Sequence, residues 1–244
     1  MNRSFLYGDG FFETIRLTLG KPEFLGLHLD RARRTAKSLQ MNWPEYWDEA
    51  FWLQEFEKFS HDTCAVRITF YRGGSGAYLP EENNLQFHLY SRDIKEGSYL
   101  FLNTALPINE LRHQLNSLLP VRTVIADKIY KDQGLLSSFK TTSALCYVIA
   151  ALEMKNREAE EIILLNQHGK VCEALSSCLI LQLEDKWVTP PLCDGPVQGT
   201  YLAFLKEWMP VVERTCTISD IKQAQAVYAV NSVYGFRRLQ LVLN

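Results

Sequence analysis

Lys140 is the residue of this 244-residue chain whose type and setting could support covalent chemistry. It follows the run Gly134–Phe139, which is made of leucine, serine and phenylalanine after its glycine, and it directly precedes a predicted helix. A lysine amine that has lost its proton can form a Schiff base with an aldehyde cofactor, and burial or a nearby cation favours the uncharged amine. A lysine beside apolar residues is also commonly a surface side chain whose stem packs on them. Both interpretations stay open for Lys140.

Glu173 and Arg31 are the charged residues that such a cofactor would need. Glu173 ends the predicted strand Val171–Glu173, and a carboxylate that is buried there needs a cationic partner. A protonated pyridine nitrogen is such a partner, and its protonation makes the ring an electron sink. The planar fork of Arg31 could bind a phosphate. An exposed strand end and a solvated helical arginine are the alternatives.

Two later segments could supply further phosphate ligands. Gly199, Thr200 and Tyr201 lie at a predicted helix start, where backbone N–H groups and the helix dipole favour an anion. Asn231 and Ser232 follow an apolar run, and side chains at such a strand end can add donors. The helix start could equally be one that binds no anion, so neither segment by itself indicates a phosphate site.

The run Tyr7–Arg16 has the sequence YGDGFFETIR, in which a Gly-Asp-Gly turn opens into a predicted buried strand. The hydroxyl of Thr14 could position a water molecule or a proton donor for an elimination. Threonine also suits a strand simply because it is β-branched. A second glycine-rich run, Arg72–Tyr78, begins with an arginine that could meet a substrate carboxylate or lie in a surface loop.

The order of these motifs resembles that of the class IV aminotransferases, the fold-type IV enzymes that use pyridoxal 5′-phosphate. The resemblance covers nearly the whole chain. Its motifs are Arg3–Thr14, His28–Ala32, Arg72-Gly73, Lys140, Val171–Glu173, Gly199–Tyr201 and Asn231-Ser232. It implies that Lys140 carries the cofactor and shuttles protons, and that Glu173 pairs with the pyridine nitrogen. The residues that it implies for the phosphate are Arg31, Thr200, Tyr201 and Ser232.

The family includes 4-amino-4-deoxychorismate lyases, branched-chain aminotransferases and D-amino acid aminotransferases. Lyases of the family tend to have threonine at the position of Thr14, and the loop Arg72–Tyr78 and the pair Asn231-Ser232 also resemble the lyases. We therefore expect a lyase that releases pyruvate and 4-aminobenzoate, with an aminotransferase as the alternative. The expected catalytic residues are Lys140 and Thr14, and the expected substrate-binding residues are Arg72, Tyr78 and Asn231. A binding protein without chemistry is a third possibility, against which the retention of Lys140 and Glu173 argues.

The resemblance implies a two-domain fold of the α+β or α/β class, like that of D-amino acid aminotransferase. We expect a small N-terminal α+β domain at 1–91, a linker at 92–97 and a larger domain at 98–244 that carries the lysine. In the first domain the pattern predicts strand–turn–strand over 5–19, helices from 25 and over 44–59, and strands at 64–71 and 85–90. In the second it predicts strands at 99–105, 227–230 and after 235, helices at 109–118, 141–156 and 199–208, and hairpins over 161–173 and 178–189.

Composition excludes several classes of function. The formal net charge is −2, with 26 basic and 28 acidic residues, so no basic excess indicates binding to nucleic acid or to an anionic membrane. No apolar stretch has the length of a membrane span, and the N-terminus lacks the apolar core of a signal peptide. The six cysteines show no spacing typical of a metal site. We expect a cytoplasmic protein that binds a small amino substrate and no metal; the resemblance adds a homodimer.

Overall fold

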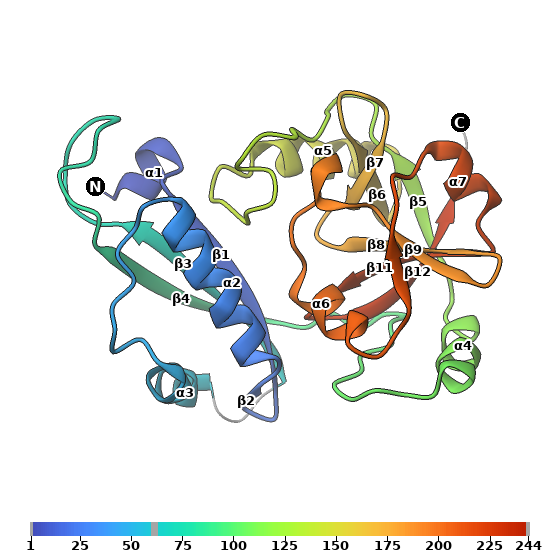
Figure 1. Ribbon diagram of the computed structural model, residues 1–244, viewed down its shortest axis with the longest axis horizontal. Helices are drawn as coiled ribbons and strands as arrows, with labels where there is room; N and C mark the ends of the chain where they lie inside the picture. Colours follow the sequence, from blue (N-terminus) through green and yellow to red (C-terminus); the bar gives the residue numbers. More distant parts are fainter. Residues whose placement is uncertain (1, 60–62, 243–244) are drawn as a thin grey trace. The chain divides into compact units, whose positions relative to one another are not determined.

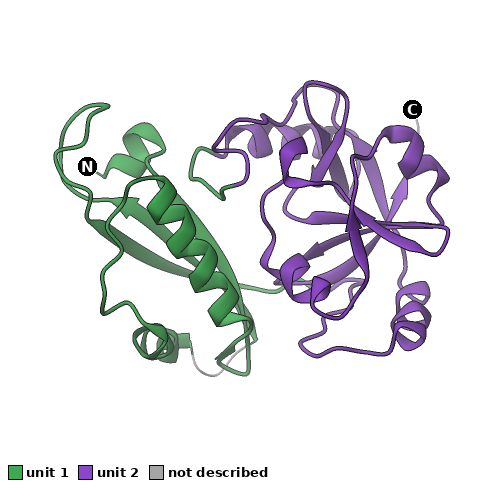
Figure 2. Ribbon diagram, viewed as in Figure 1, with its two compact units in different colours: residues 1–95, 139–143 green, residues 96–138, 144–244 purple. Residues whose placement is uncertain are grey.

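The computed structural model describes residues 2–59 and 63–242, and the chain divides into two compact units (Figure 2). Unit 1 contains residues 1–95 and 139–143, and unit 2 contains residues 96–138 and 144–244. The segment 139–143 therefore packs with the N-terminal residues. It includes Lys140, which the sequence pattern had grouped with the C-terminal part of the chain.

Unit 1 is a four-stranded antiparallel sheet with helix α2 lying along it (Figure 1). The strand order is β2-β1-β3-β4. Its elements are α1 (Arg3–Tyr7), β1 (Gly10–Thr18), β2 (Lys21–Pro22), α2 (Leu25–Ser38), α3 (Glu49–Phe56), the 3₁₀ helix η1 (Glu57–Phe59), β3 (Cys64–Arg72) and β4 (Leu85–Asp93). The apolar stripe of α2 is buried at Leu29, Ala32 and Ala36, as its spacing of three and four predicts.

The start of unit 1 differs from the predicted strand–turn–strand. Residues 3–7 form the short helix α1 because Asn2 caps it, accepting a hydrogen bond from the backbone N–H of Phe5, and Gly8 ends it at φ 66°. The predicted helix over 44–59 begins later, at Glu49, where Asp48 accepts from the backbone N–H of Phe51.

Unit 2 is built on an eight-stranded mixed sheet in the order β10-β9-β8-β11-β12-β5-β6-β7. Its helices are α4 (Ile108–Asn116), α5 (Leu145–Asn156), the 3₁₀ helix η2 (Leu192–Asp194), α6 (Thr200–Lys206) and α7 (Ile218–Gln223). Its strands are β5 (Val121–Ile125), β6 (Glu161–Leu165), β7 (Val171–Ala174), β8 (Cys178–Leu183), β9 (Lys186–Thr189), β10 (Val211–Glu213), β11 (Ala226–Asn231) and β12 (Gly235–Leu241). The two predicted hairpins are β6–β7 and β8–β9.

Two elements predicted for the C-terminal part of the chain are shorter in the structure than predicted. The expected strand at 99–105 is reduced to a single bridge between Leu100 and Phe236. Gly235 lies against this bridge at φ 72°, where a Cβ atom would come within 2.1 Å of the carbonyl oxygen of Leu100. The helix expected over 141–156 begins only at Leu145, because residues before it pair with β1 instead.

Helix α5 carries several apolar side chains that stay exposed. Leu145, Val148, Ile149 and Leu152 keep 70%, 52%, 37% and 53% of their surface exposed.

Within the described ranges, no helix combines the length and the apolar character that crossing a membrane requires.

Candidate active site

Lys140 is attached to strand β1 through its backbone. The N–H of Phe12 donates to the carbonyl of Lys140 at 2.8 Å, and the N–H of Thr142 donates to the carbonyl of Gly10 at 2.9 Å. The hydroxyl of Thr142 also donates to the carbonyl of Gly8 at 2.8 Å. These bonds hold the lysine segment at the start of the strand that follows the Gly-Asp-Gly turn.

The two glycines of that turn leave space for different neighbours, Gly8 for the lysine segment and Gly10 mainly for strand β3. A Cβ atom on Gly8 would lie 2.2 Å from the hydroxyl oxygen of Ser143, and one on Gly10 would lie 2.5 Å from the carbonyl oxygen of Phe70. Real Cβ contacts are longer than either distance. The motif that stands out in the sequence is therefore the part of unit 1 that receives the lysine segment.

The side chain of Lys140 lies beside the face of β1 that carries Thr14. Its Nζ is 4.7 Å from the centroid of the Phe12 ring, within the range of a cation–π contact. Side chains alternate along a strand, so Phe12 and Thr14 point to the same side of the sheet and Glu13 points to the other. The two predicted catalytic residues, Lys140 and Thr14, thus share one face of unit 1.

Glu13, His28 and Arg31 form a buried cluster on the opposite face of β1. Nε and Nη2 of Arg31 donate to the two carboxylate oxygens of Glu13 at 2.8 and 2.5 Å, and Nδ1 of His28 is 2.7 Å from Oε2. Burial would raise the pKa of Glu13, but the Arg31 guanidinium and the two side-chain donors outweigh it and lower the pKa to about 2. Burial, together with the cations of Arg31 and Lys140, lowers the pKa of His28. His28 is therefore neutral and donates from Nδ1 to an ionised Glu13.

This cluster bears on the predicted phosphate ligand. Glu13 takes the Nε–Nη2 edge of Arg31 in the two-pronged geometry that carboxylates favour. That edge of the guanidinium is therefore occupied by Glu13. Contact of Arg31 with a phosphate stays a prediction.

Arg72 and Tyr78, the predicted substrate-binding residues of unit 1, differ sharply in their surroundings. Arg72 is buried, and its guanidinium donates to the carboxylate of Asp9, to the backbone carbonyls of Leu39 and Gln40, and to the side chain of Asn83. These bonds account for its burial without a ligand. Tyr78 is 90% exposed. A substrate role for either residue stays a prediction.

Glu173 lies in unit 2 on strand β7, and it is buried with three donors around its carboxylate. Oε1 accepts from Nζ of Lys131 at 2.8 Å and from the hydroxyl of Tyr147 at 2.6 Å, and Oε2 accepts from the backbone N–H of Val197 at 2.8 Å. Lys131 is not among the residues predicted from the sequence, and it lies in a stretch between β5 and α5 that contains no helix or extended strand. No local pattern marks it, because its partner is 42 residues away.

The remaining predicted residues lie at the start of α6 and the end of β11. Gly199 is the N-cap of α6 and has no side chain to bond the first N–H groups, while Thr200 and Tyr201 are buried. The hydroxyl of Tyr201 accepts from the backbone N–H of Leu102 at 3.1 Å. Ser232 is buried too.

Asn231 organises the turn that follows it. Its side-chain oxygen accepts from the backbone N–H groups of Val233 and Tyr234, both at 2.9 Å, and its amide donates to Ser177. Contact of Asn231 with a substrate stays a prediction.

Comparison with known proteins places this arrangement in a family. The family model described as amino-transferase class IV matches residues 10–242. This chain belongs to the class IV aminotransferases. The resemblance expected from the motifs is confirmed, and so is the α+β fold of fold-type IV.

Individual members of this family share a quarter or less of their residues with this chain. The aminodeoxychorismate lyase of Vibrio harveyi is 25% identical over 240 residues, which span 96% of this chain and 83% of that protein. The crystal structure of 4-amino-4-deoxychorismate lyase from Pseudomonas aeruginosa has a TM-score of 0.80 at 24% identity and covers 98% of this chain and 85% of its own. The branched-chain aminotransferase of Thermoproteus uzoniensis has a TM-score of 0.79 at 20% identity, with 98% and 80% covered. The two structures show that the fold is shared.

The side chains present fit the cofactor that class IV enzymes use. An ionised carboxylate has about four acceptor positions, and three are taken on Glu173, so Oε2 retains one for a ring N–H. The first N–H groups of α6 lack a side-chain cap, as an anion-binding helix start requires.

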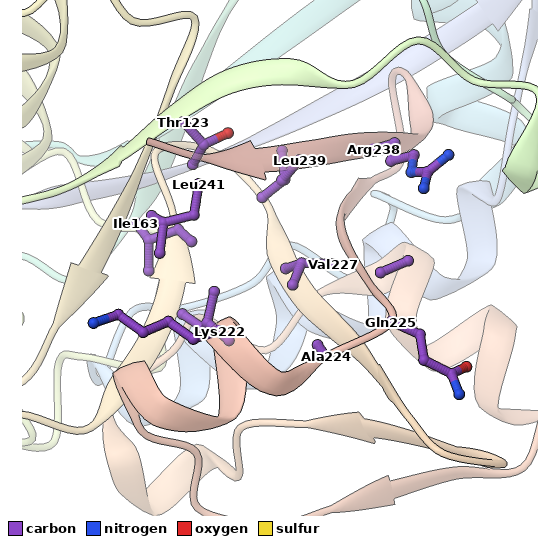
Figure 3. A pocket seen from close by; sticks show the side chains of 11 residues that line it. Thr123, Ile163, Lys222, Ala224, Gln225, Val227, Arg238, Leu239 and Leu241 are labelled. Carbon is purple, nitrogen blue, oxygen red and sulfur yellow. The ribbon is translucent and has the colours of Figure 1, made fainter. Parts of the chain in front are cut away.

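The cavity of unit 2 shown in Figure 3 holds none of these residues. Its volume is about 350 Å³, and it is lined mainly by aliphatic side chains, most of them from α7, β11 and β12. The polar side chains of Lys222, Gln225 and Arg238 also line it. It is separate from the residues that the family resemblance selects.

Proposed function

We propose that the chain is a pyridoxal 5′-phosphate-dependent 4-amino-4-deoxychorismate lyase that carries its cofactor on Lys140. The observation that carries this proposal is the attachment of Lys140 to β1, with its Nζ over the Phe12 ring and Thr14 on the same face. Membership of the class IV family and the likeness to the Vibrio harveyi lyase support it. We further propose a cytoplasmic homodimer.

The residues take the following roles in this proposal. When bound, the cofactor withdraws electrons from the carbon that bears the substrate amine. Lys140 anchors the cofactor and then moves the proton from that carbon, and the Thr14 hydroxyl orients a donor for the leaving pyruvate. Glu173 binds the ring N–H. The phosphate ligands are Arg31, Thr200, Tyr201 and Ser232, and the substrate ligands are Arg72, Tyr78 and Asn231.

An aminotransferase of branched-chain or D-amino acids is the second candidate. Its favouring observation is the structural likeness to the Thermoproteus uzoniensis aminotransferase, which is nearly as strong as that to the Pseudomonas aeruginosa lyase. Lys140 and Glu173 would serve both reactions, so these residues do not separate them.

A substrate panel tests the proposal. Purified protein reconstituted with the cofactor should be yellow, and borohydride should fix the cofactor on the peptide that contains Lys140. 4-Amino-4-deoxychorismate should then give 4-aminobenzoate and pyruvate in equal amounts. Repeated turnover of amino acids with keto acids, and none of the chorismate derivative, would instead establish the aminotransferase. Protein that stays colourless after reconstitution would exclude both.

A further inference from the structure

We propose that Lys131 is a positioning residue, whose ammonium holds the Glu173 carboxylate ionised and fixed in orientation to receive the ring nitrogen of the cofactor. The inference deepens the proposed function and rests on it, because it concerns the residue assigned there to the ring nitrogen. Its basis is a buried cluster of unit 2 that comprises Lys131, Tyr147 and Glu173.

Lys131 is fully bonded inside this cluster. Its side chain is 6% exposed and that of Glu173 is 4% exposed. Nζ lies 2.8 Å from Oε1 of Glu173, 3.1 Å from the carbonyl oxygen of Ser137 and 2.5 Å from the hydroxyl of Tyr147. An ammonium has three N–H donors, and these three partners use all of them. Lys131 is therefore held in one place with its positive charge.

The same geometry excludes Lys131 as the residue that carries the cofactor. The ring nitrogen and the aldehyde carbon lie at opposite ends of the pyridine ring. An amine bonded to the carboxylate that receives the ring nitrogen cannot also reach the aldehyde. Lys131 and Lys140 thus have different tasks, one as the counter-ion of Glu173 and the other as the cofactor attachment.

The other titratable groups near Glu173 do not supply a positive charge. Burial and the Glu173 carboxylate raise the pKa of Tyr147, and the same two causes raise the pKa of Cys172 to about 12. Burial also raises the pKa of Cys146. The nearby Asp194 is a second buried carboxyl group. Among the described residues, Lys131 is the one cation with a hydrogen bond to Glu173.

The hydrogen bonds to Glu173 suit an ionised carboxylate, which can accept one more donor. Lys131 and Tyr147 donate to Oε1, and the backbone N–H of Val197 donates to Oε2. Only an ionised carboxylate accepts all of these and keeps an acceptor position on Oε2. A buried carboxylate without its cation would bind a proton and lose this capacity. Lys131 therefore prepares the carboxylate before the cofactor arrives.

Binding of pyridoxine 5′-phosphate tests this without the covalent bond. This compound keeps the ring nitrogen and the phosphate but has no aldehyde, so its affinity does not depend on attachment to Lys140. Calorimetry should show about 10-fold weaker binding for Lys131→Met, the loss expected when a charge-assisted hydrogen bond is removed. Lys131→Arg keeps the charge and should stay within about 3-fold of the original protein. Lys128→Met, which changes an exposed lysine, is the matched control.

Unfolding of the cofactor-free protein gives a second measurement. Lys131→Met should lower Tm at pH 8 by about 10 °C, because a buried charge loses its partner. Its Glu173 should then bind a proton more readily when folded than when unfolded, so stability should fall as pH rises from 5 to 8. The pair Lys131→Met with Glu173→Gln should lack this pH dependence.

The outcomes separate this inference from the proposed function. If the original protein binds the analogue and Lys131→Met binds it equally well, Lys131 is not a positioning residue and the proposed function stands. If the original protein does not bind the analogue at all, both the role of Lys131 and the proposed function are contradicted. If the Tm of Lys131→Met depends on pH in the same way as the Tm of the original protein, the role of Lys131 is also contradicted. Should Lys131→Met fail to fold, Lys131→Arg decides, since a loss of binding by more than about 10-fold there contradicts a role that depends on charge.

Discussion

The backbone N–H of Phe12 donates to the backbone carbonyl of Lys140 at 2.8 Å, although 128 positions separate the two residues in the sequence. Strand β1 and the lysine segment are therefore one hydrogen-bonded piece of unit 1. Gly8 leaves room for that segment, and Thr14 follows on the same face of β1 as Phe12. The two most informative sequence motifs are thus joined by direct contact.

Replacing Lys140 should abolish attachment of the cofactor. Lys140→Ala should give no borohydride-stable adduct, and its lyase activity should fall by roughly 10³-fold or more, since both the anchor and the proton carrier are lost. Mass spectrometry of the digested protein measures the adduct. Lys128→Ala, at an exposed position, should keep both adduct and activity. An adduct that survives on another lysine in Lys140→Ala would contradict the assignment.

Thr14 should affect turnover and leave cofactor binding intact. Thr14→Val keeps the shape of the strand residue but removes the hydroxyl, so kcat for the lyase reaction should fall by about 10²-fold. Thr14→Ser should retain most of the activity. The absorption spectrum of the bound cofactor should be the same in both variants. Equal activity of Thr14→Val and the original protein would show that Thr14 is simply a β-branched strand residue.

Glu13 should make unit 1 sensitive to acid. Its pKa is about 2 when folded, against about 4.5 when unfolded, so it adds stability above pH 4.5 that is lost as the pH falls towards 2. The difference corresponds to about 3 kcal/mol at neutral pH. Glu13→Gln should lower the free energy of unfolding by this amount at pH 7 and by much less near pH 3.

Urea unfolding at a series of pH values measures the effect of Glu13. The quantity to compare is the difference between Glu13→Gln and the original protein, because other carboxylates also titrate in this range. Glu45→Gln changes an exposed glutamate and should leave the curve almost unchanged. A constant difference between pH 3 and pH 7 would contradict the pairing of Glu13 with Arg31 as the cause.

The sequence predicted elements whose signal is local. Helix α2 followed from apolar residues at spacings of three and four, and the β6–β7 hairpin from two apolar runs around a turn with glycine. Helix α1 carried a signal that was missed, since Asn2 and Gly8 are typical capping residues on either side of it. The assignment of Lys140 and Glu173 to the site rests mainly on motif order and stays a prediction.

The remaining features depend on contacts between distant residues. Residues 141–144 directly precede a helical pattern and were predicted to belong to it, but Thr141 and Thr142 pair with β1 instead, so the helix begins only at Leu145. Lys131 has no periodic neighbours, so its bond to Glu173 follows only from the folded unit 2. The burial of Arg72 among backbone carbonyls likewise could not be seen in the loop sequence.

Gly199 and Cys178 offer a test of packing at the start of α6. A Cβ atom on Gly199 would lie 2.4 Å from Sγ of Cys178, although the backbone of Gly199, at φ −76° and ψ 130°, suits any residue. Gly199→Ala should therefore destabilise the protein through crowding alone, by about 1–3 kcal/mol. Cys178→Ala removes the sulfur, and with it the cause of this loss.

A double-mutant cycle separates crowding from backbone effects. In the Cys178→Ala background, Gly199→Ala should be neutral or should stabilise by about 0.5 kcal/mol, because alanine restricts the unfolded chain and no longer meets the sulfur. Urea unfolding of the four proteins gives the coupling between the two positions. If Gly199→Ala has the same cost in both backgrounds, contact with Sγ does not explain this glycine. The cost of Gly199→Ala would then have another cause, such as a change in the backbone at the start of α6.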